Sequence, residues 1–470
     1  MLRRSGRDRQ VSEIIEFGGF DRIQSYEDIV SYIDSVPKFT SKTSLAHTEM
    51  ILAAMGHPEE ELQVLHVAGT NGKGSVCADL DAMLRAAGYH VGLFTSPHLI
   101  RINERFRIDG REVSDVDFAE AFQAVMQASK KVMEEGEPHP TYFEILFLMG
   151  IWLFQKAAVE YVIFEVGMGG RLDATNVIKK PLVSVITSVS LDHMQYLGET
   201  IPEIAGEKAG IIKPGVPVVY DAGRPEVSRV IEEKARQTGS PAYPLEPGRI
   251  RIAELTEDGA IFSLQNENSE ENRSGSVQDK NRREPVLLKI PQIAPYQVRN
   301  AALAWYVLQV LREDIPADPK ALAEGLASVS WPCRMQKVEP GVYIDGAHNP
   351  DGIACFLETA EVFHRKKEIT LLFSAVGDKD YRQMVKELAS LHPERVVTAR
   401  IRDRRAVSEE ELAELFRQEG CTEVYARREP EDAYRLARKL RGDGILFCVG
   451  SLYLAGELLQ AAAEFAHSDR

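Results

Sequence analysis

The feature that most constrains the fold is an apolar segment that runs into a glycine-rich loop and then directly into a helical pattern. The apolar run Leu62–Ala68 leads into Gly69-Thr70-Asn71-Gly72-Lys73-Gly74-Ser75, and an amphipathic stretch follows over 75–87. A strand, a loop and a helix in this order direct backbone N–H groups and a helix N-terminus at one point, which favours a bound phosphate. Lys73 adds a side chain that can reach terminal phosphates. The segment therefore predicts a nucleotide-binding loop at the edge of a parallel sheet.

This loop departs from the usual phosphate-loop pattern at two positions. The usual pattern has glycine where Val67 stands and Ser or Thr where Gly74 stands, so the loop is a variant. The alternative interpretation is a glycine-rich turn between strand and helix in which the lysine occurs by chance.

Short β-rich runs alternate with helical stretches in two parts of the chain, which predicts α/β domains with parallel sheets covered on both faces. The first part has expected strands at Leu62–Ala68, His90–Phe94, Tyr161–Val166, Leu182–Thr187 and Val216–Tyr220, and expected helices at Ser75–Ala87, Phe143–Lys156 and Val298–Arg312. The second part has expected strands at Val342–Ile344, Ile369–Phe373, Arg395–Ala399 and Ile445–Val449. Because 470 residues exceed one ordinary core, we expect a domain over 1–330, a linker over 331–338 and a smaller domain over 339–470.

One segment inside the first domain is too polar to join a core. Residues 265–285, which begin QNENSEENRSGSVQDKNRRE and end in Pro285, have almost no apolar side chains, which predicts a mobile, solvated loop.

Composition excludes several classes of function. The 71 acidic residues outnumber the 56 basic ones, for a formal charge of −15, so a broad nucleic-acid-binding surface is excluded and an anionic substrate would need a local basic pocket. No apolar run reaches the roughly 18–20 residues that span a bilayer, and no secretory signal follows the N-terminal arginines. The five cysteines have no metal or disulfide spacing, which favours free thiols and a cytoplasmic location.

Several further blocks follow the loop in a fixed order. They are Thr95–Leu99 (TSPHL), Thr141–Glu144 (TYFE), Glu165–Asn176 (EVGMGGRLDATN), Asp192-His193, Glu207–Ile211 (EKAGI), Asp345–Pro350 (DGAHNP) and Gly450–Tyr453 (GSLY). Together with His66–Ser75, this series resembles the folate branch of the Mur ligase superfamily, which contains folylpolyglutamate synthase and the bifunctional dihydrofolate synthase. The resemblance extends from about residue 20 to 460.

This resemblance implies a fold and a reaction. The fold is Mur-ligase-like: a phosphate-loop, parallel-sheet domain that binds ATP and folate, and a smaller Rossmann-like C-terminal domain that serves glutamate ligation. The activity is that of an ATP-dependent carboxylate–amine ligase, which joins L-glutamate to dihydropteroate, to the glutamate tail of reduced folates, or to both, through an acyl phosphate. The cofactor is Mg²⁺ at two sites, and a monomer is expected.

The expected metal ligands follow strands. Glu165 ends an apolar strand, where open parallel sheets place ligands, and a carboxylate there suits magnesium; its alternative role is to cap the following glycine turn. Imidazole is an uncommon magnesium ligand, so the resemblance alone assigns His193 to a second metal, and it assigns Ser96 to the first. From the residue alone, Lys208 is expected to be an ordinary solvated lysine. The resemblance instead implies a carbamylated lysine beside the second magnesium. Lys73, Lys208 and His193 are the expected catalytic residues.

The resemblance also assigns nucleotide and substrate contacts. The ATP set is Thr70, Asn71, Gly72, Lys73, Gly74, Ser75, Asn300, Arg334, Asp345 and His348, with Asp345 expected at the ribose. The dihydropteroate set is Thr141, Tyr142, Phe143, Glu144, Leu172, Asp173 and Ala174; a helix N-cap at Thr141 and a tight turn at Asp173 are the simpler interpretations. Two positions depart from the family pattern: Tyr296 stands in place of histidine, and Cys333 in place of a glycine. A left-handed backbone at Cys333 would cost about 1–2 kcal/mol.

Two other functions remain open. A muramyl-peptide ligase shares the loop and the mechanism, but the Gly-Lys-Gly-Ser loop and the Glu165–Asn176 block disfavour it. A nucleotide-binding switch would be expected to carry an Asn-Lys-x-Asp guanine-reading motif, which this chain lacks, and would have no use for the Asp345–Pro350 block.

Overall fold

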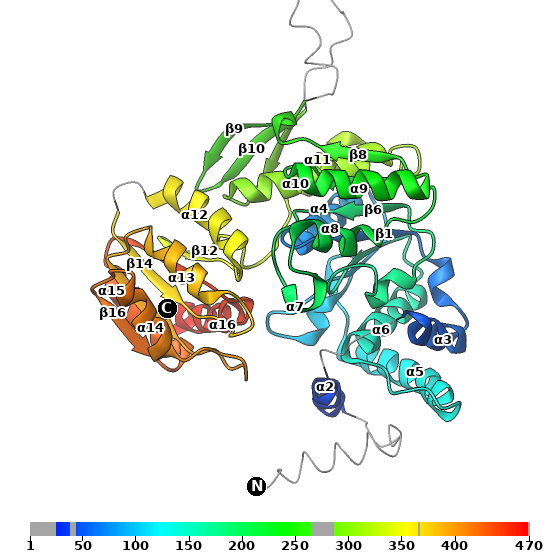
Figure 1. The fold of residues 1–470 in the computed structure, drawn as a ribbon, viewed down its shortest axis with the longest axis horizontal. Helices are drawn as coiled ribbons and strands as arrows, with labels where there is room; N and C mark the ends of the chain where they lie inside the picture. The colour runs from blue at the N-terminus through cyan, green and yellow to red at the C-terminus, as the bar shows by residue number, and fades with distance from the viewer. Residues whose placement is uncertain (1–24, 38–43, 266–285, 365–366, 469–470) are drawn as a thin grey trace, which may run out of the picture.

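The computed structural model describes residues 25–37, 44–265, 286–364 and 367–468 (Figure 1). Two sheets of mostly parallel strands dominate it, one in the N-terminal part and one in the C-terminal part, with a small antiparallel sheet beside them. The mixed α/β fold with a separate C-terminal α/β domain is the one that the sequence predicts. No helix among these residues is both long enough and apolar enough to cross a membrane.

The N-terminal sheet has the strand order β4-β3-β2-β5-β1-β6-β7-β8, and six of its strands, from β2 to β8 across the sheet, run parallel. Its strands are β1 Val64–Ala68, β2 Val91–Phe94, β3 Phe106–Ile108, β4 Arg111–Glu112, β5 Tyr161–Glu165, β6 Val183–Ile186, β7 Val218–Asp221 and β8 Ala242–Leu245. The central strand β1 is buried along its whole length, because it lies between β5 and β6 and helices cover both faces.

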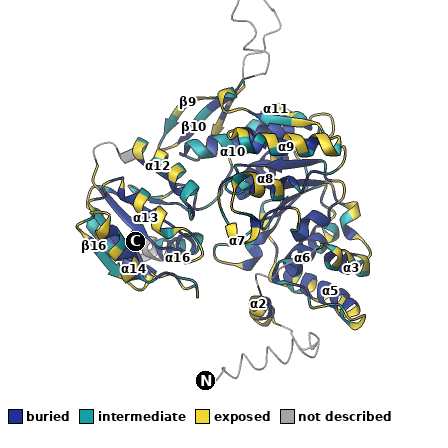
Figure 2. Cartoon of the chain, viewed as in Figure 1, coloured by how far each residue is buried: buried dark blue, intermediate teal, exposed yellow. Residues whose placement is uncertain are grey.

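Helices cover this sheet, some in direct contact with its strands and others in a second layer against those helices. They are α2 Tyr26–Ser35, α3 Ala46–Met55, α4 Lys73–Ala86, α5 Asp115–Glu134, α6 Tyr142–Lys156, α7 Met194–Leu197, α8 Ile201–Ala209, α9 Pro225–Thr238, α10 Pro295–Val310 and α11 Pro319–Ala327, with 3₁₀ turns η2 Pro58–Glu61, η3 Ile102–Arg105, η4 Ala174–Val177 and η5 Pro247–Arg249. Figure 2 shows α6 largely buried, whereas α5 and α9 present exposed residues outward. Helix α6 is apolar nearly all round, as expected of a helix inside the core.

The C-terminal sheet has the strand order β12-β13-β17-β14-β15-β16, with only β12 antiparallel. Its elements are β12 Gln336–Glu339, β13 Val342–Ile344, α12 Pro350–His364, β14 Ile369–Phe373, α13 Tyr381–Ala389, β15 Arg395–Ala399, α14 Glu409–Gln418, β16 Val424–Arg427, α15 Pro430–Arg441, β17 Ile445–Val449 and α16 Leu452–Ser468. The four strands expected from the sequence coincide with β13, β14, β15 and β17.

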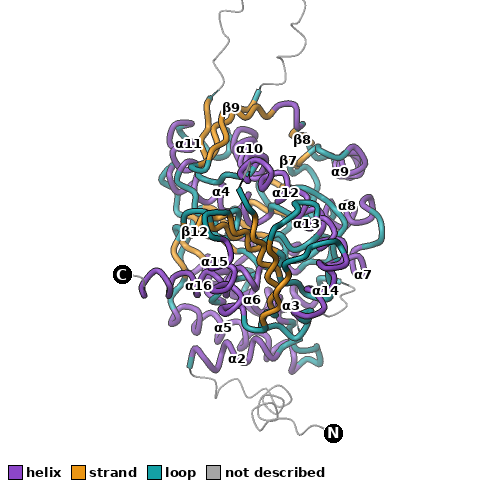
Figure 3. Tube along the Cα trace, turned by 90° about the vertical axis from the view of Figure 1, so that its left-hand side faces the viewer, coloured by secondary structure: helices purple, strands orange, loops and turns teal. Residues whose placement is uncertain are grey.

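A three-stranded antiparallel sheet, in the order β11-β10-β9, lies beside α10 and α11 (Figure 3). It consists of β9 Ile250–Thr256, β10 Gly259–Leu264 and β11 Leu287–Ile290. The sequence does not predict a strand here, because β9 is mostly exposed and its polar residues mask the pattern of a half-buried strand. Apart from Gln265, the polar segment 265–285 lies outside the described residues.

Other departures from expectation have local causes. Strand β12 begins at Gln336, inside the segment 331–338 expected to be a linker, because pairing with β13 extends the second sheet. Strand β1 begins at Val64 and not at Leu62, since Pro58 opens a 3₁₀ turn just before it. Helix α10 begins at Pro295, a residue suited to the first helical position. The five cysteines form no disulfide, as predicted.

An aromatic cluster joins the sheet to α6. The ring of Phe164 on β5 is fully buried and lies 5.3 Å from Phe147 and 5.9 Å from Phe94 and Phe154, measured between ring centroids. These edge-on and tilted contacts, together with complete burial, make Phe164 a principal anchor between the two layers.

We expect Phe164→Ala to lower the free energy of unfolding by about 3–5 kcal/mol, because the ring leaves a cavity that its neighbours only partly fill. Val116→Ala on α5 is the control, since Val116 is 68% exposed. Urea denaturation followed by circular dichroism measures both changes. Equal stability of the two variants would contradict this role for Phe164.

Candidate functional site

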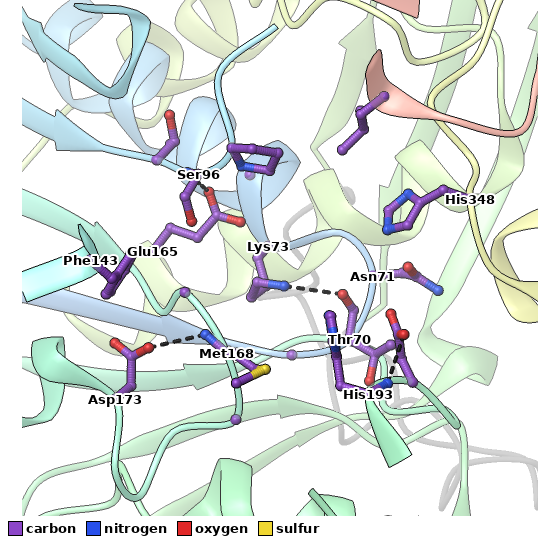
Figure 4. A pocket seen from close by; sticks show the side chains of 18 of the residues that line it. Thr70, Asn71, Lys73, Ser96, Phe143, Glu165, Met168, Asp173, His193 and His348 are labelled. Atoms are coloured by element: carbon purple, nitrogen blue, oxygen red, sulfur yellow. Dashed lines mark hydrogen bonds between the residues drawn. The ribbon is translucent and has the colours of Figure 1, made fainter. Parts of the chain in front are cut away.

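A cavity of about 610 Å³ lies between the carboxyl edge of the N-terminal sheet and the C-terminal domain. Side chains from both domains line it (Figure 4). Most of the sequence-predicted residues are among them: Thr70, Asn71, Gly72, Lys73, Gly74, Ser96, Thr141, Tyr142, Phe143, Glu165, Leu172, Asp173, Ala174, His193, Lys208, Arg334 and His348.

The glycine-rich loop joins β1 to α4 and is tied to the end of β6. The Thr70 amide donates to the Ser188 carbonyl at 2.7 Å, and the Thr187 hydroxyl donates to the Asn71 carbonyl at 2.7 Å. Gly72 has φ +85°, and a Cβ there would lie 2.4 Å from Asn300 Oδ1, so only glycine fits. Lys73 opens α4, and its ammonium donates to the Thr70 carbonyl at 3.1 Å. Its charge therefore lies over the loop, inside the cavity.

Glu165 and Ser96 form one set of candidate metal ligands. The Ser96 amide donates to Glu165 Oε2 at 2.9 Å, and the carboxylate is 3% exposed. Burial raises the pKa of Glu165, while the Lys73 charge opposes that shift. A carboxylate and a hydroxyl are hard oxygen donors, so this pair has the chemistry that magnesium prefers.

The second set of candidate ligands is His193, which lies on the other side of Lys73 from Glu165 (Figure 4), and Lys208, whose charge acts on His193. Burial, and then the Lys379 charge, lower the pKa of His193 to about 4, which leaves a neutral imidazole. Lys208 is buried and donates from Nζ to the Gly69 carbonyl at 2.8 Å. Burial, and then the Lys73 charge, lower the pKa of Lys208 to about 7. Two nitrogens do not suit magnesium, so this set fits a divalent ion only if Lys208 carries a carboxylate.

The C-terminal domain contributes an ion pair that the sequence analysis did not predict. The ammonium of Lys379, in the loop between β14 and α13, contacts Asp192 Oδ1 at 2.5 Å, and both side chains are 9% exposed. Burial alone would raise the pKa of Asp192, but the Lys379 charge holds it well below its usual range. Lys379 Nζ also lies 3.4 Å from His193 Nε2. The sequence feature that could have indicated a site residue at Lys379 is its position in the loop that follows the apolar strand β14.

A pair of amides joins the two domains at the loop itself. The Asn71 and Asn349 side chains donate to each other, at 3.2 and 3.1 Å, and Asn349 Nδ2 also lies 3.1 Å from Asp192 Oδ2. Asn349 Oδ1 accepts from the Gly352 amide at 2.8 Å, which caps the first turn of α12. Asn349, also not predicted, therefore connects the phosphate loop to a helix of the second domain.

Four predicted site residues do not line the cavity. The clearest case is Glu144, whose carboxylate is engaged elsewhere: it accepts from the Thr48 hydroxyl at 2.7 Å and forms a capping box with Thr141, as the simpler interpretation of Thr141 predicts. Ser75 accepts from Gln297, and Asn300 lies behind Gly72. The fourth residue is Asp345.

Asp345 is held by Tyr296, one of the two residues that depart from the family pattern, and by two backbone amides. Its carboxylate accepts from the Tyr296 hydroxyl at 2.5 Å and from the Met335 and Ala347 amides at 2.8 Å. Cys333 does adopt the left-handed backbone, with φ +57°. Its carbonyl accepts from Arg334 at 3.0 Å. Tyr296 therefore contacts Asp345 of the second domain through its hydroxyl, and a histidine at this position would need a different geometry to contact the same carboxylate.

The cavity supplies the local basic pocket that an acidic chain needs for an anionic ligand. Its lining includes seven cationic residues, namely Lys73, Arg105, Arg107, Lys208, Arg334, Lys379 and Arg405. The aromatic ring of Phe143 and the backbone of the Gly167–Gly170 turn form part of another wall. One cavity thus combines a glycine-rich loop and cationic side chains with an aromatic, hydrogen-bonding wall.

A phosphate loop on a parallel sheet, facing a second α/β domain across a cationic cavity, defines a two-domain nucleotide-dependent enzyme. Two family models match the chain: the Mur ligase middle domain over residues 67–308, and the Mur ligase, glutamate ligase domain over residues 333–452. The chain belongs to the Mur ligase family.

Relatives and solved structures place it in the folate branch, as the sequence predicts. It is 38% identical to dihydrofolate synthase/folylpolyglutamate synthase of Bacillus subtilis, over 78% of this chain and 83% of the relative. The fold is similar to that of Mycobacterium tuberculosis folylpolyglutamate synthase complexed with ADP, with a TM-score of 0.82, 27% identity and coverage of 93% and 98%. It is also similar to E. coli FolC in complex with DHPP and ADP, with a TM-score of 0.79, 27% identity and coverage of 94% and 99%. The chain is a ligase of this branch, not a nucleotide switch.

We expect Lys379→Met to destabilise the protein by about 3 kcal/mol at pH 7, because it leaves the Asp192 carboxylate buried without its cation. The folded-state pKa of Asp192 lies below its unfolded value of about 3.9, so the pair stabilises the protein above that value and loses its contribution as the pH falls through the folded pKa. The gap in melting temperature between wild type and variant should therefore be full above about pH 5 and shrink below about pH 4. Calorimetry across this range measures it, with exposed Lys386→Met as the control. A gap independent of pH would contradict the assignment.

Proposed function

We propose that the chain joins L-glutamate to the carboxylate of a pterin-containing acid at the expense of ATP. The observation that carries this proposal is the single cavity in which Lys73 and the phosphate loop lie opposite a wall of Phe143 and Asp173. The related E. coli FolC binds DHPP and ADP together, which supports a nucleotide at one end and a pterin at the other.

The reaction proceeds in two transfers. A carboxylate oxygen of the acid attacks the γ-phosphorus of ATP, the bond to the bridging oxygen breaks, and ADP leaves; the product is an acyl phosphate. The amine nitrogen of L-glutamate then attacks the acyl carbon, loses a proton, and phosphate leaves with the C–O bonding pair. Both steps develop negative charge on phosphate oxygens, which Lys73 and the N–H groups of the loop stabilise. The rest of catalysis is positioning, which suits a cavity closed by two domains.

The ATP contacts divide between the domains. Thr70, Asn71, Gly72, Lys73, Gly74 and Ser75 form the loop that holds the phosphates. From the second domain, Arg334 and His348 line the same cavity, and the His348 Nδ1–H donates to the Gly346 carbonyl at 2.8 Å, which leaves Nε2 for a ligand. Asn300 and Asp345, which lie behind the cavity surface, would act by supporting Gly72 and the turn before α12.

Two magnesium ions would fit the two sets of donors, the second set only with a carboxylate on Lys208. Bound there, magnesium supplies positive charge to the phosphate oxygens and orients them. Glu165 and Ser96 would hold the first ion. His193 and a carbamylated Lys208 would hold the second, because the carbamate replaces a repelling cation with oxygen donors.

The surroundings of Lys208 favour that modification. Capture of carbon dioxide needs a neutral amine: nitrogen attacks the carbon, and the proton that nitrogen loses passes to solvent. With a pKa of about 7, roughly half of the Lys208 side chains are neutral at pH 7, against a very small fraction for an ordinary lysine.

Dihydropteroate, a reduced folate, or both are the proposed acid substrates. Thr141, Tyr142 and Phe143 at the start of α6 and Leu172, Asp173 and Ala174 opposite them form the proposed pterin end of the cavity. A monomer and a cytoplasmic location remain predictions from the sequence.

The proposal predicts glutamate-dependent phosphate release from ATP when dihydropteroate is added, and none with a muramyl-peptide precursor. Lys73→Ala should lower kcat by about 10²-fold or more, because a preorganised charge is lost from the transition state. Lys180→Ala, which changes an exposed lysine remote from the cavity lining, is the control. Release with the muramyl precursor, or no release with either dihydropteroate or a reduced folate, would refute the proposed substrate class.

A carbamate on Lys208 predicts a bound resonance in carbon-13 NMR spectra of the protein equilibrated with labelled bicarbonate. The resonance should be absent in Lys208→Ala, which should also be inactive while it still binds ATP. Acetate or formate at high concentration should restore part of the activity by occupying the vacated anion site. Lys213→Met is a matched control, since the pKa of Lys213 is also lowered, to about 8, but its ammonium contacts the Asn176 carbonyl outside the cavity. A wild-type spectrum without the resonance would refute the carbamate.

A further inference from the structure

A buried histidine on the central strand has no role in the reaction described so far. His66 lies in the middle of β1, in register with Phe164 on β5 and Ser184 on β6, and is fully buried. It does not line the cavity. Its Nε2 lies 2.8 Å from the Thr175 hydroxyl, and Nδ1 is among the buried polar atoms of the described residues that have no hydrogen-bond partner.

The direction of the hydrogen bonds around Thr175 follows from its single hydroxyl proton. Thr175 Oγ1 donates to Asp173 Oδ1 at 2.6 Å, where a carboxylate can only accept. The same oxygen must therefore accept from His66, so Nε2 carries the hydrogen and Nδ1 carries none. Burial, and then the Lys213 charge, lower the pKa of His66 to about 3, so the ring stays neutral in this tautomer at physiological pH.

The chain of hydrogen bonds continues to the cavity wall. Asp173 Oδ1 also accepts from the Thr175 amide at 3.0 Å, and Asp173 Oδ2 accepts from the Met168 amide at 3.0 Å (Figure 4). Met168 belongs to the glycine-rich turn Gly167–Gly170, which lines the cavity together with Asp173. Three fixed donors thus hold the carboxylate, and the carboxylate holds the turn.

Stability alone does not explain the imidazole. An unpaired buried nitrogen costs about 1–3 kcal/mol, whereas an apolar side chain at this position would bury no polar atom. The neighbouring strand positions Val64 and Ala68 on the same face are apolar and fully buried. The one interaction that His66 makes and an apolar residue would not is the donation to Thr175.

We propose that His66 is a positioning residue for the pterin end of the cavity: by donating to Thr175 it fixes Asp173 and the Gly167–Gly170 turn against which the acid substrate binds. The substrate part of this inference rests on the proposed function. The placement of the turn does not.

The first experiment measures function and stability in the same variants. His66→Leu and Thr175→Val remove the hydrogen bond between the two side chains while keeping apolar volume. His66→Gln restores a donor, and Thr175→Ser restores a hydroxyl. We expect the first two to raise the KM for dihydropteroate by about tenfold, as one lost hydrogen bond implies, with the KM for ATP within about twofold. His66→Leu should melt no lower than wild type, and the two conservative variants should recover most of the KM. A lower melting temperature for His66→Leu with unchanged KM values would show a core-filling histidine and overturn the proposal.

The second experiment needs no substrate. Hydrogen–deuterium exchange should speed up in residues 167–173 in His66→Leu and Thr175→Val, because the Met168 amide loses a fixed acceptor. Ser184→Ala is the control. Ser184 is in register with His66, but its hydroxyl donates to the Ile211 carbonyl at 3.0 Å and takes no part in the hydrogen bonds from His66 to Met168. Unchanged exchange in both variants would overturn the positioning role. If exchange speeds up but wild type shows no turnover with any pterin acid, the proposed function fails and the positioning of the turn stands.

Discussion

The parallel pairing of β5, β1 and β6 is the constraint on which the rest of this structure depends. Val67 pairs with Glu165, and Ala68 with Ile186, so three strands end at the same level. That register brings the phosphate loop, the Glu165 carboxylate and the loop that leads to Asp192 to one edge of the sheet, although they lie far apart in the sequence. Carboxyl ends of parallel strands are where open α/β sheets bind ligands, and here each of the three contributes a different kind of group.

Cationic side chains allow anions to bind at that edge, although the chain as a whole has a net charge of −15. The seven ammonium and guanidinium groups that line the cavity, four from the first domain and three from the second, would repel one another without compensation. The structure shows two forms of compensation. Asp192 neutralises Lys379 directly, and Lys208 responds to burial and to Lys73 by losing basicity. The second response turns a lysine into a nucleophilic amine at neutral pH, which is the chemical condition for a carbamate.

The sequence predicts an element or a site residue where local pattern and chemistry coincide, and does not where tertiary contacts decide its structure or its partners. The strands β13, β14, β15 and β17 are apolar runs bounded by turns, so their positions were predictable. Strand β12 exists because it pairs with β13, and no local signal marks it. Glu144 belongs to a block that resembles substrate-binding residues, yet it does not line the cavity, and its carboxylate caps α6 and accepts from Thr48. Lys379 and Asn349 act across the domain boundary, a relation that a single sequence does not express.

The interface between the domains gives the phosphate loop a second set of restraints. Thr187 and Ser188 hold the Asn71 carbonyl from the first domain, while Asn349 and Asp351 contact its side-chain amide from the second. Asn71 is therefore positioned by both domains at once, and Asp192 links Asn349 to Lys379 in the same network. A reaction that passes a phosphoryl group to one substrate and then admits an amine needs both domains aligned on the same loop. Directional hydrogen bonds across the boundary, together with apolar contacts such as that of Leu99 with the core of the second domain, align the two domains on that loop.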